Sequence, residues 1–152
     1  MASDAQIIKL SFDAAVLDSS VVIKWFRERE ALREQALIVR RAYLEGQLKV
    51  FVPDLLFYEI ANVLRYKSDL SEEHVLVAVR TLFDLRFEQV SVTPRLLARA
   101  IEIAYKCDVT VYDAIFVACA EGVDGVLITA DEELVAACAQ LSVVRFLGDI
   151  TS

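Results

Sequence analysis

A regular alternation of short apolar segments with longer amphipathic ones constrains the fold of this chain more than any other feature. Five short segments read as strands, because they hold four to six mostly apolar residues. The segments between them repeat their apolar positions with the period of a helix. Strands separated by helices predict a parallel sheet covered on both faces. We therefore expect an α/β fold, a three-layer α/β/α sandwich with a mainly parallel sheet of four or five strands.

The expected elements can be placed along the chain. The strands are expected at residues 14–18, 49–53, 87–92, 125–129 and 143–146. The helices are expected to begin at residue 19 and then to cover residues 28–47, 54–68, 71–85, 93–107, 111–121 and 131–141. Asp54, Ser71 and Thr93 are the expected caps of the helices that they begin. Residues 14–150 are expected to form one domain, preceded by a tail of residues 1–13.

The composition narrows the class of protein. Hydrophobic residues make up 57% of the 152 residues and charged residues 26%, which excludes a disordered chain. No apolar stretch approaches a membrane span, and the N-terminus has no basic region followed by a long apolar run. The three cysteines lack metal-ligand spacing, and their odd number argues against a disulfide framework. We expect a cytoplasmic protein that is not bound to a membrane.

Four carboxylates stand where a parallel sheet and its helices would gather them. Asp18 ends the first strand, and Asp131 follows the fourth within two residues. Sites in such sheets form outside the carboxyl ends of the strands, so both side chains are expected at one edge. Glu59 and Asp113 lie on helices that are otherwise almost entirely apolar. A carboxylate on a buried helix is costly to desolvate unless it is paired or binds metal, and neither helix offers a lysine or arginine on the same turn.

Each acid also has a purely structural interpretation. Asp18 and Asp131 can cap the helices that follow them, and Thr129 is an alternative cap for the second. Asp113 can complement the dipole of its helix, and Glu59 can lie on the surface. A divalent cation would account for all four positions together. Oxygen ligands without histidine or cysteine favour Mg²⁺ or Mn²⁺ over zinc, and such ions commonly serve phosphate chemistry.

The four stretches that carry these acids resemble the PIN domain family, and more closely its VapC-like toxin ribonucleases. They are VLDSSVVIKWF (16–26), VPDLLFYEIANVLRY (52–66), TVYDAIFVACAEG (110–122) and LITADEEL (127–134). Any one stretch is weak evidence, whereas all four in this order are specific. The resemblance runs from about Ala15 to Phe146, nearly the whole chain.

The resemblance implies a metal-dependent endoribonuclease that leaves a 5′-phosphate and a 3′-hydroxyl. Asp18 and Asp113 would be the principal ligands of Mg²⁺ or Mn²⁺, and Asp131 would complete the site. Glu59 would bind a second ion or orient the attacking water. Polar positions around such a site are matched by Ser20, Asn62, Thr110 and Thr129. The family also implies a homodimer and a cognate antitoxin that blocks the acidic site.

The net charge of −7 at first disfavours RNA as a partner, because phosphates demand positive charge. Two divalent ions would cancel the charge of four carboxylates. Basic side chains are densest at Lys24, Arg27, Arg29, Arg33, Arg40 and Arg41. They can contact RNA, or they can form a solvated helix face with Glu28, Glu30 and Glu34, since both signs are interleaved.

Two rival functions fit parts of the sequence. A PIN-like module could bind RNA or a protein without turnover, and metal binding would separate this module from an enzyme. A receiver domain predicts an acid pair after the first strand and a lysine after a late strand. Here the first strand ends in Asp18-Ser19, and LGD follows the last strand. The metal-dependent endoribonuclease is therefore the leading hypothesis.

Overall fold

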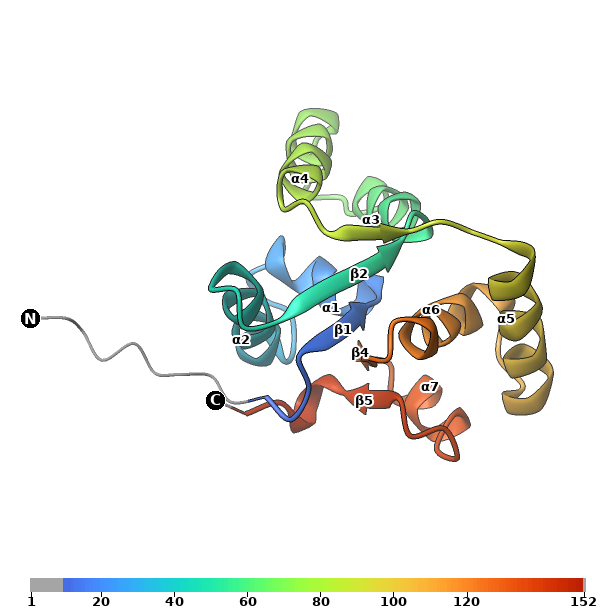
Figure 1. Cartoon of the computed structure of the whole chain (residues 1–152). Coiled ribbons are helices and arrows are strands. Elements are labelled where there is room, and N and C mark those ends of the chain that lie inside the picture. Colours follow the sequence, from blue (N-terminus) through green and yellow to red (C-terminus); the bar gives the residue numbers. More distant parts are fainter. Residues whose placement is uncertain (1–9, 152) are drawn as a thin grey trace, which may run out of the picture.

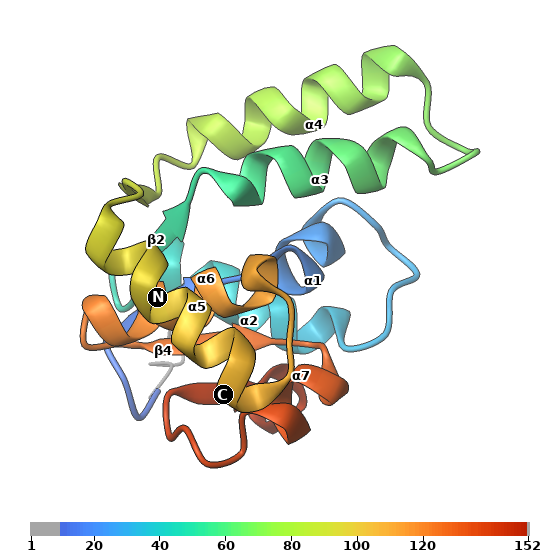
Figure 2. The ribbon, with the colours of Figure 1, turned by 90° about the vertical axis from the view of Figure 1, so that its right-hand side faces the viewer.

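A parallel sheet of five strands forms the centre of the computed structural model, which describes residues 10–151. The strands are β1 (Ala14–Leu17), β2 (Lys49–Pro53), β3 (Glu88–Val90), β4 (Val126–Thr129) and β5 (Val144–Phe146). They lie in the order β3-β2-β1-β4-β5, and every neighbouring pair is parallel. Helices flank the sheet on its two sides (Figures 1 and 2). The predicted three-layer parallel fold is therefore confirmed.

The helices occur in the predicted order but are shorter than predicted in several places. They are α1 (Ser19–Val22), α2 (Arg33–Leu44), α3 (Leu55–Arg65), α4 (Glu72–Asp84), α5 (Pro94–Cys107), α6 (Val111–Gly122) and α7 (Glu132–Ala137), with the 3₁₀ helices η1 (Ile23–Trp25) and η2 (Leu147–Asp149). Helices α3 and α4 lie side by side as a hairpin at one end of the sheet (Figure 2).

The core is densest where β1 and β4 meet α6. Leu17 pairs with Ile128 across these two strands, and both side chains are completely buried. Helix α6 contacts β1, β2 and β4, and all seven of its residues in 114–120 are buried. Burial of these apolar residues fixes the position of α6 against the sheet. The first turn of α6, which holds Asp113, is therefore held close to the edge where β1 and β4 end.

Two of the three predicted helix caps are confirmed. The hydroxyl of Ser71 accepts a hydrogen bond from the His74 amide at 3.2 Å, and the hydroxyl of Thr93 accepts one from the Leu96 amide at 3.1 Å. The prediction for Asp54 is wrong, because its backbone is already helical (φ −62°, ψ −20°) and its side chain makes no capping bond. A cap normally needs an extended backbone for its side chain to turn back onto the helix.

The predicted helix over residues 28–47 is wrong at its start. Helix α2 begins only at Arg33, and Leu32 before it adopts a left-handed conformation with φ of 61°. Tertiary contacts explain the break, because the Trp25 indole donates to the Ala36 carbonyl at 2.8 Å and Arg33 Nε donates to the Lys24 carbonyl at 3.2 Å. These bonds fold α2 back onto η1, and the local helical pattern yields to them.

Several predicted ends also lie too far out. The predicted strand 87–92 contains only β3, and the predicted helix 131–141 ends at Ala137. The chain then turns towards β5, where the Leu141 amide donates to the Cys138 carbonyl at 2.9 Å. Residues 1–9 of the predicted N-terminal tail lie outside the described residues. No helix within residues 10–151 is long and apolar enough to cross a membrane.

Candidate functional site

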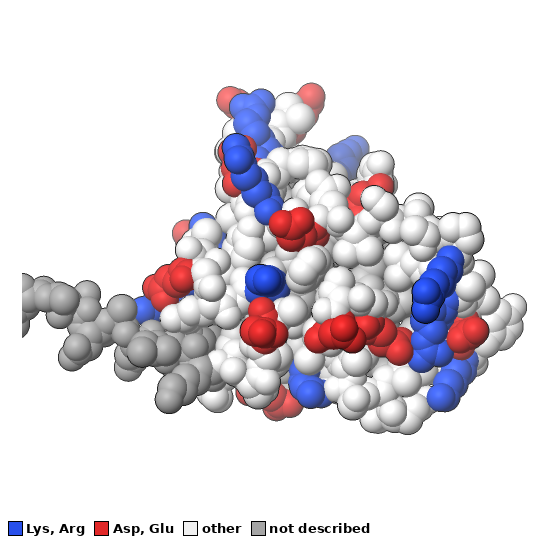
Figure 3. All heavy atoms as spheres, viewed as in Figure 1, with Lys and Arg blue, Asp and Glu red and all other residues white. Residues whose placement is uncertain are grey.

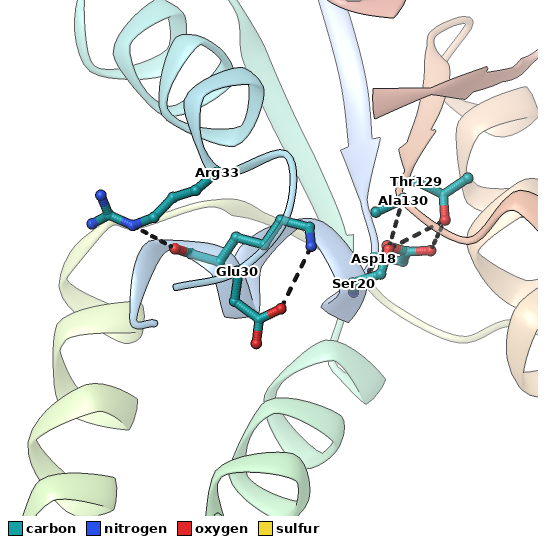
Figure 4. Close-up of polar contacts among 7 residues, drawn as sticks. Asp18, Ser20, Glu30, Arg33, Thr129 and Ala130 are labelled. Atoms are coloured by element: carbon teal, nitrogen blue, oxygen red, sulfur yellow. Dashed lines mark hydrogen bonds and ion pairs between the residues drawn. The ribbon is translucent and has the colours of Figure 1, made fainter. Parts of the chain in front are cut away.

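Asp18 lies at the carboxyl end of β1, where it caps a helix and also accepts a bond from a distant residue. Its Oδ1 accepts hydrogen bonds from the amide and the hydroxyl of Ser20, at 3.1 and 2.5 Å. Its Oδ2 accepts a hydrogen bond from the hydroxyl of Thr129, at the end of β4, at 2.5 Å. Figure 4 shows the three side chains turned toward one another. The carboxylate is thus held at the edge shared by the two central strands.

Ser20 also links the end of β1 to the end of β4. Its hydroxyl oxygen accepts a hydrogen bond from the Ala130 amide at 2.8 Å (Figure 4). Sequence reasoning placed Ser20 and Thr129 near the acids but missed the Ala130 amide. A backbone amide carries no side-chain signal, so no sequence pattern could have indicated it.

Asp131 begins α7 as its cap and lies at the same edge as Asp18. Its Oδ1 accepts hydrogen bonds from the amides of Glu133 and Leu134, at 3.0 and 3.2 Å. The structural interpretation of both aspartates as caps is therefore correct. The caps do not exclude a second role, because Asp131 keeps Oδ2 for another partner, and the structure gives that oxygen no bond within residues 10–151.

Asp113 lies half-buried in the first turn of α6, opposite the strand ends. Thr110 caps this helix, and its hydroxyl accepts a hydrogen bond from the Asp113 amide at 3.1 Å. Burial raises the pKa of the Asp113 carboxyl above its usual range, and the Asp131 carboxylate raises it further. The Thr110 hydroxyl partly opposes that rise. Asp113 is thus a carboxylate whose charge its surroundings disfavour.

Glu59 projects from α3 into the same region. Its Oε1 is buried and has no hydrogen-bond partner within residues 10–151. Burial, then the carboxylates of Asp18 and Asp113, raise its pKa to about 7. A buried acceptor without a partner is costly, and such atoms in folded proteins frequently mark a site for an ion or a water molecule. The purely structural interpretation, in which Glu59 lies on the surface, is therefore wrong.

The four acids act electrostatically as one group. Burial raises the pKa of Asp18 to about 6, against the hydrogen bonds from Ser20 and Thr129, and Asp113 adds to the rise. Each of the four acids therefore influences, or is influenced by, at least one other acid. Within the described residues, the ion pairs between lysine or arginine and a carboxylate include none of the four. Their mutual repulsion is left without a protein cation.

The four side chains are of the chemical kind that binds a divalent cation, but they are too far apart to hold one ion together as they stand. All four donors are carboxylates, which suits Mg²⁺ or Mn²⁺, and the unpartnered Glu59 oxygen offers a free ligand. No three carboxylate, histidine or cysteine side chains of residues 10–151 stand close enough to hold one ion as they are. Binding would therefore have to draw the carboxylates together, which their repulsion otherwise opposes.

The other predicted polar position and the basic residues behave differently. Asn62 is exposed and makes no side-chain hydrogen bond within the described residues, although it lies on the same helix as Glu59. Three of the basic residues are paired with acids: Lys24 with Glu30 at 3.7 Å, Arg27 with Asp69 at 2.8 Å and Arg41 with Glu45 at 3.0 Å. On the face seen in Figure 3, charges of both signs lie in small groups. Of the acids in these three pairs, only Glu30 belongs to the predicted set of Glu28, Glu30 and Glu34, and Lys24 itself is buried. The solvated helix face and the RNA contact therefore both stay predictions.

The remaining candidate ligands lie in structural positions. Cys107, Cys119 and Cys138 are all free thiols and buried. His74 is exposed, and its Nδ1 accepts a hydrogen bond from the Ser71 amide at 3.1 Å, which completes a capping box at the start of α4. A carboxylate site is therefore the candidate that the described residues support.

Comparison with known proteins places the chain in a family context. The family model described as "PIN domain" matches residues 15–140. No curated protein sequence is similar enough to count as a match. Among solved structures, PAE2754 from Pyrobaculum aerophilum is 21% identical, with a TM-score of 0.64 and 90% of each chain covered.

Two further solved structures have comparable folds. A toxin–antitoxin complex from Klebsiella pneumoniae contains a chain that is 17% identical, with a TM-score of 0.64 and 88% of this chain and 97% of that chain covered. VapC20 from Mycobacterium tuberculosis, described as a toxin that cleaves the sarcin–ricin loop, is 16% identical, with a TM-score of 0.64 and coverages of 81% and 94%. At these identities the likeness shows a shared fold.

Proposed function

This chain belongs to the PIN domain family, and we propose that it is a metal-dependent endoribonuclease, the toxin of a toxin–antitoxin pair. The observation that carries the proposal is the group of four acids at the carboxyl edge of β1 and β4. Burial and mutual repulsion raise the pKa of three of them, and no protein cation pairs with any of them in the described residues. Shifts of this kind gather at functional sites more often than elsewhere.

Asp18, Asp113 and Asp131, together with Glu59, would hold Mg²⁺ or Mn²⁺. Bound there, the ion would activate a water molecule and neutralise the phosphate during in-line displacement. Asp18 suits the position of principal ligand, because hydrogen bonds from Ser20 and Thr129 fix its orientation. The Ala130 amide in turn fixes Ser20. Partners of this kind commonly orient ligands at metal sites.

Glu59 suits the orientation of the attacking water. Its buried Oε1 has no hydrogen-bond partner within the described residues, so it can accept a hydrogen bond from that water. A carboxylate in this place can take up the proton that the water loses. Water attack on the phosphodiester would leave a 5′-phosphate and a 3′-hydroxyl.

The proposal extends to the partners of the chain. We propose a cognate antitoxin, a homodimer and a cytoplasmic location for this protein. The similarity to a chain in the Klebsiella toxin–antitoxin complex supports the antitoxin, and the three free thiols are consistent with a reducing compartment.

Metal removal tests the enzymatic proposal directly. Purified protein with Mg²⁺ or Mn²⁺ is expected to cleave a pool of single-stranded and structured RNA, and EDTA is expected to stop cleavage because the acids then lack their counter-charge. The ends of the products should be a 5′-phosphate and a 3′-hydroxyl, read by ligation and sequencing. Cleavage that persists in EDTA, or products with a 2′,3′-cyclic phosphate, would contradict the proposed mechanism. RNA binding without cleavage under all metal conditions would instead support the binding module.

A further inference from the structure

The carboxylate of Asp18 uses most of its hydrogen-bonding capacity inside the protein. A carboxylate has two oxygens, and each oxygen can accept two hydrogen bonds. The amide and the hydroxyl of Ser20 occupy both acceptor sites of Oδ1, at 3.1 and 2.5 Å. The hydroxyl of Thr129 occupies one acceptor site of Oδ2, at 2.5 Å. Within residues 10–151, one acceptor site of Asp18 therefore remains free, and it belongs to Oδ2.

Two backbone amides fix the direction of these hydroxyl protons. An amide N–H can only donate, and a hydroxyl has a single proton. The Ala130 amide donates to the Ser20 oxygen at 2.8 Å, and the Asp131 amide donates to the Thr129 oxygen at 3.1 Å. Each hydroxyl thus keeps its proton for Asp18, and Figure 4 shows both hydroxyls beside that carboxylate. These 2.5 Å bonds are shorter than the 3.3 Å contact between the two hydroxyl oxygens.

Asp131 also offers a single oxygen to an ion. Its Oδ1 accepts hydrogen bonds from the amides of Glu133 and Leu134, at 3.0 and 3.2 Å, which occupy both acceptor sites of that oxygen. An ion can therefore reach Asp131 only through Oδ2. Two of the four acids are thus limited to contact through one oxygen each, and for both the limit is set by hydrogen bonds to neighbouring residues.

The number of oxygens that a carboxylate offers influences which ion it binds. Ca²⁺ takes about six to eight oxygen ligands and often binds both oxygens of one carboxylate. Mg²⁺ and Mn²⁺ suit octahedral sites, to which each carboxylate gives one oxygen. A site whose aspartates are held to one oxygen each therefore favours the smaller ions.

From these contacts we propose that the Ser20 hydroxyl determines which ion the site accepts. By occupying Oδ1, it restricts Asp18 to contact through Oδ2 and so selects Mg²⁺ and Mn²⁺ against Ca²⁺. Ser20 is a positioning residue, because it acts on the ion through Asp18. Thr129 orients Oδ2 but does not take part in this selection, because loss of its hydroxyl leaves Oδ1 occupied. This inference rests on the proposed function, since the ion is the cofactor of that enzyme.

The ratio of the affinities for Mn²⁺ and Ca²⁺ provides the test. Each ion is titrated separately into the full-length protein, and calorimetry gives the two dissociation constants. The wild-type protein is expected to prefer Mn²⁺. Ser20→Ala is expected to bind Mn²⁺ about tenfold more weakly, as loss of a partner of a metal ligand commonly causes. Its affinity for Ca²⁺ is expected to be kept or raised, because Oδ1 becomes available. Ser20→Thr keeps the hydroxyl and is expected to keep the wild-type ratio.

Thr129→Val is the matched control for loss of a hydroxyl that bonds to Asp18. Valine has the shape of threonine, and the two bonds from Ser20 still occupy Oδ1. Both ions are therefore expected to lose affinity by the same factor, about tenfold, and the ratio should not change. Circular dichroism confirms the folding of each variant. Ser20→Ala is expected to fold, because Ser20 is only partly buried and its amide still bonds to Asp18.

The outcomes separate this inference from the proposed function. If wild-type protein binds Mn²⁺ but folded Ser20→Ala keeps the wild-type ratio, the inference is overturned and the acidic metal site stands. Ser20 would then only support Asp18 structurally. The inference is also overturned if the wild-type protein binds Ca²⁺ as tightly as Mn²⁺, or if Thr129→Val changes the ratio as much as Ser20→Ala. A wild-type protein that binds neither ion overturns the inference and the proposed function together.

Discussion

Replacing Asp113 with asparagine is expected to lower metal-dependent RNA cleavage by more than about 100-fold, the effect that loss of even an outer partner of a metal ligand can reach. Asparagine has the same shape but no charge, so the site loses one of its carboxylate ligands. Asp113 is the central acid of the group, because its charge acts on Asp18 and Glu59, and Asp131 acts on it. Initial rates of RNA cleavage at saturating Mn²⁺ measure the effect.

The fold of this variant is expected to survive. Thr110, and not Asp113, provides the side-chain cap of α6, and removal of a half-buried charge relieves repulsion. Asp108→Asn is the matched control, since Asp108 is exposed, loses the same charge and has a left-handed backbone (φ 53°) that asparagine tolerates. A folded Asp113→Asn protein that cleaves RNA as fast as this control would refute the assigned mechanism.

The metal-free protein is expected to lose stability as the pH rises through the pKa values of its buried acids. The pKa of Asp18 is raised from 3.8 to about 6, and that of Glu59 from 4.5 to about 7. Between these pairs of values the folded state holds protons that the unfolded state has released. The two protonated groups therefore make their full contribution to the free energy of unfolding below about pH 4. That contribution is lost as the pH rises through 6 and 7.

Asp18→Asn isolates the contribution of that residue. Asparagine can still cap α1, but it carries no charge at any pH. In EDTA, the free energy of unfolding of the variant relative to the wild type is expected to rise by about 2 kcal/mol between pH 4 and pH 8. Urea denaturation at several pH values measures this difference. A difference that does not change with pH would show that Asp18 is not destabilised by its charge, and the argument for a required counter-ion would lose its main support.

The periodic pattern and the capping residues predicted most of the fold. The helix starts at Ser71 and Thr93 could be recognised because the capping bond is local. In both, a hydroxyl-bearing residue accepts a hydrogen bond from an amide only three residues later. The start of α2 was not, because it depends on the bond from Trp25 to Ala36, which closes the loop between η1 and α2. Local propensity over residues 28–32 favours a helix, and the packing of η1 against α2 overrides it.

The sequence indicated which four acids to consider for the candidate site, but not the bonds that connect the ends of β1 and β4. Acids on apolar helices and after central strands indicated Asp18, Glu59, Asp113 and Asp131. The bond from Thr129 to Asp18 joins residues 111 positions apart, and the bond from the Ala130 amide to Ser20 joins residues 110 apart. Such contacts exist only once β1 and β4 pair, so no local pattern reports them. Asn62 is the opposite case. Its spacing from Glu59 on α3 suited a place at the site, but its side chain is exposed.

Titration of Mn²⁺ into the wild-type protein and into Asp113→Asn, followed by calorimetry, tests the central claim that the four acids hold a divalent ion. We predict saturable binding by the wild-type protein, with protons released because Asp18 and Glu59 are partly protonated near neutral pH. We predict that this binding is lost in Asp113→Asn and retained in Asp108→Asn. A well-folded wild-type protein that binds no Mn²⁺, or an Asp113→Asn variant that binds it equally well, would contradict the account.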